Sequence, residues 1–473
     1  MPGRREGCRS GVGLLALAVL PGCSPVEVRS PADGVTLGAP WTPVVVHAPA
    51  RFEGGEVSVS VDGTPLGDPL ALVRAAAGPG VDLLATLHLG DLEEGPHRLE
   101  ARWRALDGEV ATASSTFTVT RAPARVIFEV VDGAGQPTSA RVLVRDRHGP
   151  VSLAGPEPAA ADPSGRFTGF SSVFVTGGRG VVDLDPGTYT FVAVRGPREE
   201  IDQQTVKIDG DRTVSMVVPR VVDTPGQLLA DLHVHTGRSG DSYLPDDPRF
   251  RSLLAAGIDV AVTTDHNAVT DVADRLEALV ADGTDLRLVA GVEANIHDGD
   301  VSLGHFNAFP LATSDLPPDP SSPSVPAYID AYALLSGSPL LQLNHPRGIQ
   351  FAPDEALDAD AHALFTRLGF DPGLPLDDPA NVWLVTASPA SGTRALDFDA
   401  LEVANRFSRA GYRATRNDWF ALMNQGWWLT GTGNSDSHAL EVERAGFPAN
   451  LVAVPAPAAG ESLDTAAFVS ALR

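Results

Sequence analysis

Cysteine and lysine are both scarce in this sequence of 473 residues. Two cysteines, Cys8 and Cys23, cannot form the disulfide framework of a stapled scaffold, and sites built from several thiolate ligands are excluded. Lys207 is the only lysine among 35 basic residues, which stand against 60 acidic ones and give a formal net charge of -25. Nucleic-acid-binding proteins need clustered Lys and Arg to meet phosphates, so we expect no nucleic-acid partner.

The apolar stretch nearest the N-terminus is short. Residues 11–20 follow three arginines, and a membrane-spanning helix would need about 20 apolar residues. The stretch is typical of a secretory signal peptide, and its end, Leu20-Pro21-Gly22-Cys23, resembles the lipobox of bacterial lipoproteins. The resemblance implies a signal peptide over 1–22, lipid attachment at Cys23, and export to the outer face of a bacterial membrane, periplasmic or at the cell surface. The alternative is an ordinary signal peptide with a chance cysteine.

Glycine and proline are abundant, with 47 and 39 residues, and favour turns over long helices. Residues 57–61 alternate apolar and polar side chains before Asp62-Gly63, which is typical of a strand entering a hairpin. Several such strands predict an immunoglobulin-like β-sandwich over 23–122. A second all-β module is expected over 123–222, where 184–194 resembles the closing hairpin of carboxypeptidase regulatory-like β-sandwich domains. We expect these modules to act as spacers or to bind a substrate or surface polymer.

Beyond Gly226 short apolar runs alternate with helical windows at 248–256, 271–281, 328–335 and 354–368, which predicts βα units around a parallel sheet or barrel. Residue types that bind metals follow five of the predicted strands. They are Asp231, His233, His235, Asp265, His266, Glu293, His345, Asp436 and His438. Each signal alone is weak, but strand ends of a βα barrel converge on one face, so the set favours a metal centre. Imidazoles with carboxylates suit Zn, Mn or Fe.

Six short motifs in this part of the chain resemble the ordered motifs of the PHP (polymerase and histidinol phosphatase) superfamily. They lie at 231–236, 264–267, 291–293, 304–307, 344–347 and 435–438. The resemblance covers about 229–455 and is greatest to the CehA/McbA branch of metallohydrolases. It implies a distorted (β/α)7 barrel over 226–473 that holds two or three divalent ions.

Carried over by position, the resemblance implies nine metal ligands in three groups. The first group is His233, His235, Glu293 and Asp436. The second is Glu293, as a bridging carboxylate, with His305 and His345. The third is His266 and His438 with Asp241, the residue six beyond His235.

The expected activity is hydrolysis of small phosphate mono- or diesters by a metal-bound hydroxide at a di- or trinuclear site. The catalytic candidates are Glu293, Asp265 and Arg347. Asp265, like Asp231, is expected to orient imidazole N–H groups. Arg347 could grip a substrate phosphate through its planar fork, or form a surface ion pair with an acidic neighbour.

Two alternatives stay open at this point. The same site could hydrolyse carboxylic or carbamate esters, or the chain could be a surface lipoprotein that binds carbohydrate or protein without catalysis. Six asparagines flank the motifs and could also orient ligands, although loop turns explain most of them. They are Asn267, Asn295, Asn307, Asn344, Asn405 and Asn434. His297 and His362 lie outside the motifs and are not expected to be ligands.

Overall fold

The structure is a computed structural model that describes residues 26–473 with gaps. The gaps are 39–40, 50–55, 67–70, 75–79, 106–107, 121–122, 148, 152, 154–167, 170, 186, 243, 271–285, 299–300, 316, 319–320, 322–323, 336, 350–362, 407, 441–443 and 458–460. The expected signal peptide and Cys23 lie outside the described residues, as does the expected helix over 271–281.

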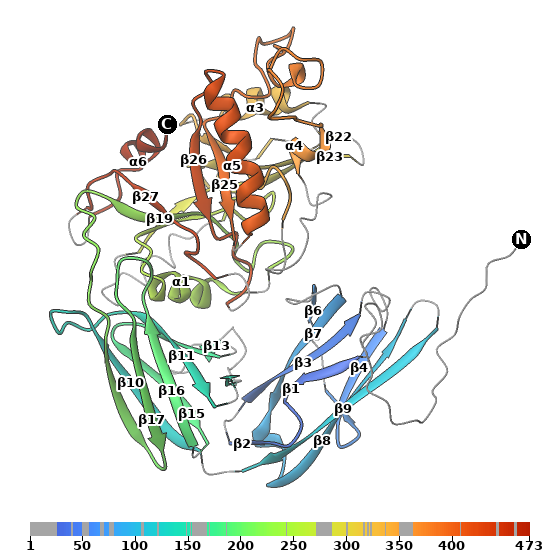
Figure 1. Cartoon of the computed structure of the whole chain (residues 1–473), viewed down its shortest axis with the longest axis vertical. Helices are drawn as coiled ribbons and strands as arrows, with labels where there is room; N and C mark the ends of the chain where they lie inside the picture. Colours follow the sequence, from blue (N-terminus) through green and yellow to red (C-terminus); the bar gives the residue numbers. More distant parts are fainter. Residues whose placement is uncertain are drawn as a thin grey trace, which may run out of the picture.

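The first β module, strands β1 to β9, is built from two sheets in a sandwich-like arrangement (Figure 1). One sheet has the order β1 (Glu27–Ser30), β3 (Trp41–Pro49), β7 (Gly80–His88) and β6 (Ala71–Arg74); the other has β2 (Val35–Leu37), β9 (Val110–Val119), β8 (Gly95–Arg104), β4 (Glu56–Val61) and β5 (Thr64–Pro65). Alternate residues of β8, such as Leu99 and Trp103, are buried in one core with Val44 and Val46 of β3. The period-two pattern of the sequence therefore forms the interior of a sandwich.

The hairpin expected at Asp62-Gly63 joins β4 to β5. Both residues have positive φ, 50° for Asp62 and 81° for Gly63. A two-residue turn of this kind matches the twist of the flanking strands, and Asp-Gly tolerates its backbone best. The local sequence signal therefore predicts this turn correctly.

The second β module, strands β10 to β18, also has two sheets. One has the order β15 (Arg179–Leu184), β10 (Ala124–Val131) and β18 (Arg212–Val217); the other has β13 (Thr168–Gly169), β14 (Ser172–Val175), β11 (Ala140–Asp146), β16 (Gly187–Val194) and β17 (Asp202–Ile208), with β12 (Gly149–Pro150) on β11. Phe128 of β10 and Phe191 of β16 meet edge to face at 5.0 Å in a shared core, so the two sheets pack against each other. The described residues between 26 and 218 are thus β-rich and sandwich-like.

The C-terminal unit, from β19 to α6, holds two further sheets and the described helices. The first sheet has the order β21 (Arg287–Ala290), β20 (Val260–Thr263), β19 (Leu228–Val234) and β27 (Asn450–Val452); the second has β22 (Val292–Asp298), β23 (Val301–Phe309), β24 (Leu340–Leu343), β25 (Ala400–Asn405) and β26 (Thr430–Asn434). The helices are α1 (Asp246–Ala255), α3 (Val325–Ala333), α4 (Leu364–Arg367), α5 (Arg409–Asn424) and α6 (Thr465–Leu472).

The expected (β/α)7 barrel over 226–473 is wrong. The described strands form two separate mixed sheets. In the first, β19, β20 and β21 are parallel, whereas β27 pairs antiparallel with β19. In the second, β23 pairs antiparallel with both β22 and β24. β21 leads into β22 through Gly291 alone, without a helix. Apolar runs bounded by polar residues predict buried strands, but whether neighbours pair parallel or antiparallel depends on the connection between them.

The two sheets of the C-terminal unit are joined near the carboxyl ends of β19 and β20. Isolated parallel bridges link Val234 to Ser437 and His266 to Glu293. The first bridge places the turn after β26 beside the end of β19, and the second places the loop after β20 beside β22. Polar residues of several motifs therefore meet at this junction, although the described strands form no barrel.

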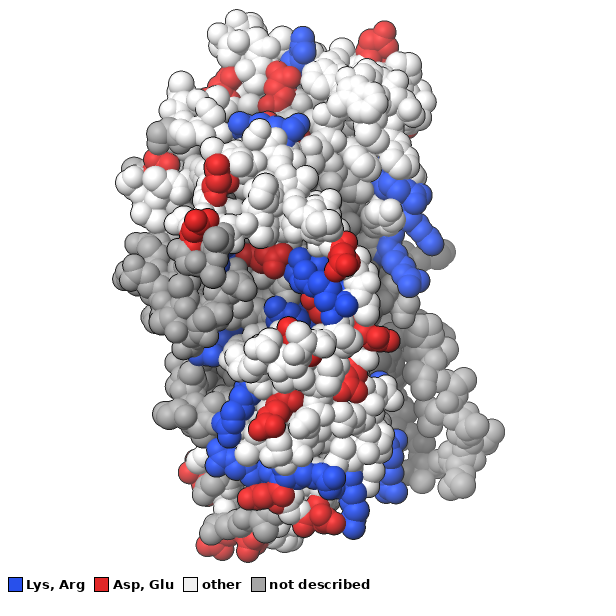
Figure 2. Space-filling view, turned by 90° about the vertical axis from the view of Figure 1, so that its left-hand side faces the viewer, with Lys and Arg blue, Asp and Glu red and all other residues white. Residues whose placement is uncertain are grey.

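None of the helices in the described parts of the chain is both long enough and apolar enough to cross a membrane. On the face shown in Figure 2, acidic and basic side chains are interspersed.

Candidate metal centre

The structure brings the nine expected metal ligands to the junction of the two C-terminal sheets, but one expected group differs. The donor group of Glu293 and His305 is completed by His266 and not by His345, which lies beside Oε1 of Glu293. His233 lies in β19 and His235 directly follows its end, so the two side chains leave the same face of the strand. The others come from the loops after β19 and β20, from β22 and β23, and from turns after β24 and β26. His345 and Asp436 stand in those turns with positive φ of 26° and 46°. Backbone of this kind is strained for non-glycine residues and is typical of functional sites.

The innermost group contains His233, His235, Glu293 and Asp436. Their nearest atoms are the two Nε2 nitrogens, Oε2 of Glu293 and Oδ1 of Asp436, and five of the six distances among them are 3.1–3.3 Å. A regular tetrahedron with such edges has its centre about 2.0 Å from each corner, which is a Zn–N or Zn–O bond length. The four atoms therefore fit one divalent ion.

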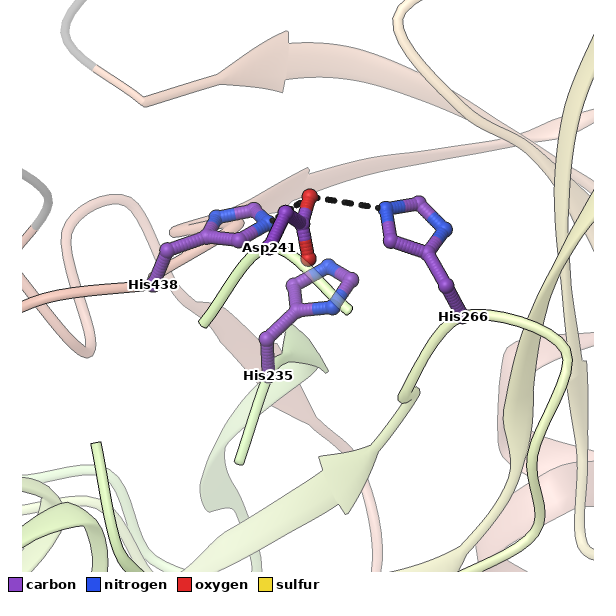
Figure 3. A group of neighbouring side chains, drawn as sticks. All are labelled: His235, Asp241, His266 and His438. Carbon is purple, nitrogen blue, oxygen red and sulfur yellow. Dashed lines mark hydrogen bonds and ion pairs between the residues drawn. The ribbon is translucent and has the colours of Figure 1, made fainter. Parts of the chain in front are cut away.

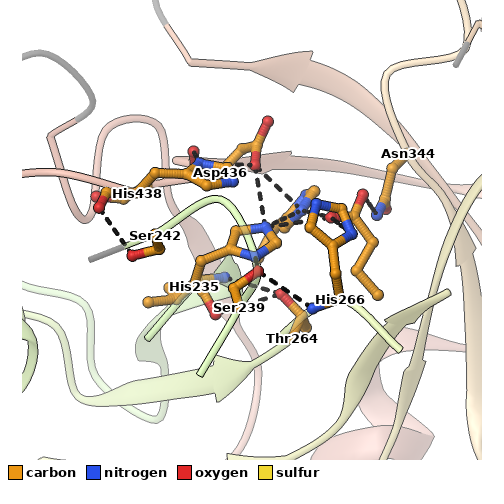
Figure 4. Close-up of polar contacts among 12 residues, drawn as sticks. His235, Ser239, Ser242, Thr264, His266, Asn344, Asp436 and His438 are labelled. Carbon is orange, nitrogen blue, oxygen red and sulfur yellow. Dashed lines mark hydrogen bonds and ion pairs between the residues drawn. The ribbon is translucent and has the colours of Figure 1, made fainter. Parts of the chain in front are cut away.

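Hydrogen bonds behind the two imidazoles determine which nitrogen carries the proton. Nδ1 of His233 lies 3.0 Å from Oε1 of Glu402 and donates to it. Nδ1 of His235 lies 3.0 Å from Oγ of Ser239, which donates its own hydrogen to Oδ1 of Asp241 at 2.7 Å and so accepts from His235 (Figure 4). In their neutral forms both imidazoles thus present Nε2 lone pairs to each other. Such a group of lone pairs requires a positive charge among them.

Glu293 lies at the centre of the site, and its two oxygens face different partners. Oε2 lies 3.1 Å from Nε2 of both His233 and His235. Oε1 lies 3.0 Å from Nδ1 of His305 and 3.3 Å from Nε2 of His345, and it accepts a hydrogen bond of 2.9 Å from Asn344. A carboxylate with imidazoles on both oxygens has the arrangement of a bridge between two cations.

A third group, shown in Figure 3, lies nearer the surface. Oδ2 of Asp241 lies 3.1 Å from Nε2 of His266 and 3.0 Å from Nε2 of His438. The rings of His235 and His438 stack with centroids 3.9 Å apart, so this group adjoins the innermost one. His235, Asp241, His266 and His438 offer atoms that all lie within 4.8 Å of one another.

Exposure increases from the innermost group to the third group. The side chains of His233 and His235 are inaccessible to solvent, whereas His438, His266 and Asp241 are 13%, 16% and 50% exposed. The centre is therefore most accessible to solvent from the side of Asp241.

The charges of the site shift the pKa values of its histidines. Burial by itself would lower the pKa of His233, but the carboxylates of Glu293 and Asp436 outweigh it and raise the pKa well above its usual range. At His266 the same balance raises the pKa to about 9, with Glu293 as the largest favourable charge. Burial lowers the pKa of His235, and the neighbouring His438 lowers it further. The carboxylates around these histidines therefore favour positive charge at the site.

The pKa values of the carboxylates at the site are lowered instead. Burial would raise the pKa of Glu293, but surrounding histidines, His233 first, lower it well below its usual range. The pKa of Asp436 is likewise lowered against burial, mainly by Arg406, whose guanidinium lies 3.0 Å from its Oδ2. Both acids therefore stay ionised at neutral pH, as metal ligands must be.

Asp231 and Asp265 hold backbone and hydroxyl groups, which differs from the expected role of orienting imidazoles. Asp231 accepts from the backbone N–H groups of Ser435 at 3.1 Å and Gly446 at 2.8 Å. Asp265 accepts from the backbone N–H and the hydroxyl of Thr236 at 2.6 and 2.7 Å. Both acids thus fix the loops that carry the histidines, and a catalytic role for Asp265 stays a prediction.

The guanidinium of Arg347 forms a bidentate ion pair with a neighbouring acid. Its Nε and Nη2 donate to the two oxygens of Asp418 at 2.7 and 2.6 Å, and Nη2 also donates to the carbonyl of Phe370. This is the ion-pair alternative considered for Arg347, although Asp418 is buried in α5 rather than exposed. Binding of a substrate phosphate by Arg347 stays a prediction.

Among the residues that contact the ligands and that the sequence did not reveal are Glu402, Arg406 and Ser239. Glu402 lies in the apolar strand β25 and contacts His233; an acid inside such a strand is the signal that could have revealed it. Arg406 follows the same strand with a positive φ of 50° and pairs with Asp436. None of the three stands inside one of the motifs.

Several of the flanking asparagines do contact the ligands. Asn295 lies 2.8 Å from Nδ1 of His266, and Asn405 donates to Oδ2 of Asp436 at 3.1 Å. His297, in β22, belongs to none of the three donor groups found among the described residues, and His362 lies outside the described residues.

No protein-family model matches the chain, and no curated protein matches it. Solved structures give only weak, partial likenesses. An endo-β-1,4-mannanase from Thermotoga petrophila is 16% identical over 20% of each chain with a TM-score of 0.18, so the chain spans a fifth of that enzyme. BcpA, the major pilin subunit of Bacillus cereus, is 10% identical over 42% of this chain and 70% of the pilin with a TM-score of 0.18. Tandem Ig repeats of Dlar are 13% identical over 41% and 96%, with a TM-score of 0.17. Likenesses of this strength carry no argument about function.

Proposed function

We propose that this chain is a metal-dependent phosphoesterase that hydrolyses small phosphate mono- or diesters at the centre around Glu293. The observation that carries the proposal is the position of Glu293, whose Oε2 faces His233 and His235 and whose Oε1 faces His305 and His345. Donor sets on both sides of one carboxylate suit two neighbouring divalent ions, Zn, Mn or Fe.

The resident ions would activate water and neutralise the charge that develops on a phosphoryl group. Hydrolysis then joins the water oxygen to phosphorus and breaks the ester P–O bond, and the leaving alcohol takes up a proton.

The chain's own residues support this chemistry by orientation and access. Glu402 and Ser239 hold the protons of His233 and His235 away from the centre, so that both Nε2 lone pairs point inward. The greater exposure of Asp241 leaves one side open to a substrate, while burial keeps bulk water away from the innermost donors. The motifs' resemblance to a metallohydrolase superfamily points to the same class of reaction.

The test is a substrate panel with the full chain, loaded in turn with Zn²⁺, Mn²⁺ and Fe²⁺. Phosphomonoester, phosphodiester and carboxylic ester reporters are compared, and Glu293→Gln is the inactivating variant. Glu129→Gln, on an exposed position of β10, is the matched control. We expect phosphoester turnover that E293Q abolishes and E129Q retains. Turnover of the carboxylic ester alone would instead support an ester hydrolase, and metal binding without any turnover would support a non-catalytic surface protein.

A further inference from the structure

We infer that the second β module positions the metal centre, because it holds both ends of β19, the strand that carries the innermost histidines. The inference rests on the proposed function in so far as His233 and His235 are ligands. It assigns positioning roles to Arg198 and to helix α1, and it replaces a spacer role for this module.

The first contact holds the start of β19. Arg198, whose side chain is 4% exposed, donates to Oδ2 and Oδ1 of Asp259 at 2.8 and 3.1 Å and to the carbonyl of Gly257 at 2.8 Å. Oδ2 of Asp259 also accepts from the backbone N–H of Leu229 at 2.7 Å, and the N–H of Asp259 donates to the carbonyl of Leu229. A bidentate guanidinium thus fixes the acid that holds the second residue of β19.

The second contact reaches the other end of β19 through α1. Arg251 of α1 donates to Oγ1 of Thr176 in the second β module at 2.9 Å, and Arg195 of that module donates to the carbonyl of Leu254 in α1 at 3.3 Å. On the same helix the fully buried Arg249 donates to the carbonyl of His235 at 2.8 Å. The module therefore holds α1, the helix whose Arg249 fixes the backbone of His235 (Figure 1).

Arg249 also connects this helix with the opposite side of the site. Its Nη1 donates to Oγ of Ser437 at 2.6 Å, between the two ligands Asp436 and His438. A shift of α1 would consequently move both the His235 and the Ser437 loops.

Two glycines show how closely the module and the C-terminal unit approach each other. A Cβ atom on Gly196 would lie 2.4 Å from the carbonyl oxygen of Ala256, and a Cβ atom on Gly257 would lie 2.4 Å from that of Arg195. Both glycines have positive φ, 117° and 70°. The contact is thus backbone against backbone from both sides, which a tethered spacer or an independently moving binding module would not need.

The experiment uses the full chain and compares Arg198→Met with Arg212→Met. Arg212 lies at an exposed position of β18 in the same module, where its Nη1 donates to the carbonyl of Lys207 at 3.4 Å. Zn²⁺ affinity is measured by competition with a chromophoric chelator, and hydrogen exchange is followed in β19 and, for reference, in β25. We expect R198M to weaken Zn²⁺ binding about tenfold and to speed exchange in β19 more than in β25, while R212M changes neither. Arg198→Lys, which keeps the charge, should recover part of the affinity.

Thr176→Val provides a milder test at the other end of the strand, because it removes only the hydroxyl that accepts from Arg251. We expect it to raise exchange at the C-terminal end of β19 and to weaken Zn²⁺ binding by about threefold, which is less than the 10- to 100-fold typical of losing a direct partner of a ligand. Unchanged β19 exchange in folded R198M and T176V would overturn the inference. A wild-type chain that binds no divalent ion would overturn the proposed function instead, and the exchange data would still decide whether the module holds the strand.

Discussion

Nδ1 of His233 and Oε1 of Glu402 lie 3.0 Å apart, and neither side chain is accessible to solvent. Glu402 uses its other oxygen to accept from the backbone N–H of His345 at 2.9 Å. One acid from β25 thus supports a histidine of the innermost group and a histidine on the far side of Glu293.

Glu402→Gln tests this support. The amide cannot keep both acceptor contacts and loses the charge opposite His233, so we expect Zn²⁺ affinity to fall about 10- to 100-fold. Equilibrium competition with a chelator measures the change, and E129Q serves as the surface control. Wild-type affinity in E402Q would show that Glu402 is not needed to orient His233.

Removal of divalent ions should destabilise the protein. The ionised carboxylates of Asp436 and Glu293 lie close to imidazole nitrogens whose lone pairs converge on them, so these groups repel one another. A bound ion would replace this repulsion with attraction. Free Zn²⁺ at one hundred times its Kd should add about 2.7 kcal/mol to the free energy of unfolding. Calorimetry with and without EDTA measures the shift in Tm, which should largely disappear in Glu293→Ala. Equal Tm values with and without chelator in the wild type would argue against a resident ion.

Asp185, in the second β module, should make stability depend on pH. Burial raises the pKa of Asp185 to about 6, although the backbone N–H of Gly38 offsets part of the effect. Because the folded pKa lies above the unfolded value of 3.8, this group's contribution is greatest below pH 3.8 and is lost as the pH rises to about 6. The lost contribution is about 1–2 kcal/mol for a partly solvated carboxyl.

Asp185→Asn should therefore raise Tm at pH 7.5 and leave it nearly unchanged at pH 3.5. Asp209→Asn, at an exposed position beside Lys207, provides the control. A variant whose Tm gain is the same at both pH values would contradict the assignment.

The ion pair of Arg347 with Asp418 gives a test that separates structure from substrate binding. Asp418 is 1% exposed, so Arg347→Met should cost about 3–5 kcal/mol by leaving a buried acid unpaired. Arg347→Met with Asp418→Leu should lose less than the sum of the two single variants, which urea unfolding measures. If Arg347 binds substrate phosphate instead, R347M should keep its stability and raise KM.

The grouping of the site residues was predictable from local pattern, whereas the architecture was not. His233 and His235 alternate on a strand, His266 and His345 each follow a buried apolar strand, and Asp436 follows β26, so their convergence needed only adjacent strand ends. A barrel is one way to achieve this, and two mixed sheets joined by short bridges are another. The apolar pattern does not distinguish them, because whether neighbouring strands pair parallel or antiparallel depends on the connection between them.

Contacts that depend on the path of a loop were also beyond sequence reasoning. Asp231 and Asp265 were expected on imidazoles but accept from backbone and hydroxyl groups. Glu402 and Arg198 come from segments without any motif. An acid inside the apolar strand β25 was a signal for Glu402, but its partners, like those of Arg198, follow only from where folding places the side chain.

The exposure of the three donor groups has a kinetic consequence. An ion bound beside His233 would reach and leave it past the more exposed Asp241, His266 and His438. The outer position should therefore exchange rapidly with solution, while the inner ion is retained through many exchanges of the outer one. Loading would consequently proceed from inside to outside, and a chelator would first produce a partly loaded protein whose inner ion leaves at the rate of local opening.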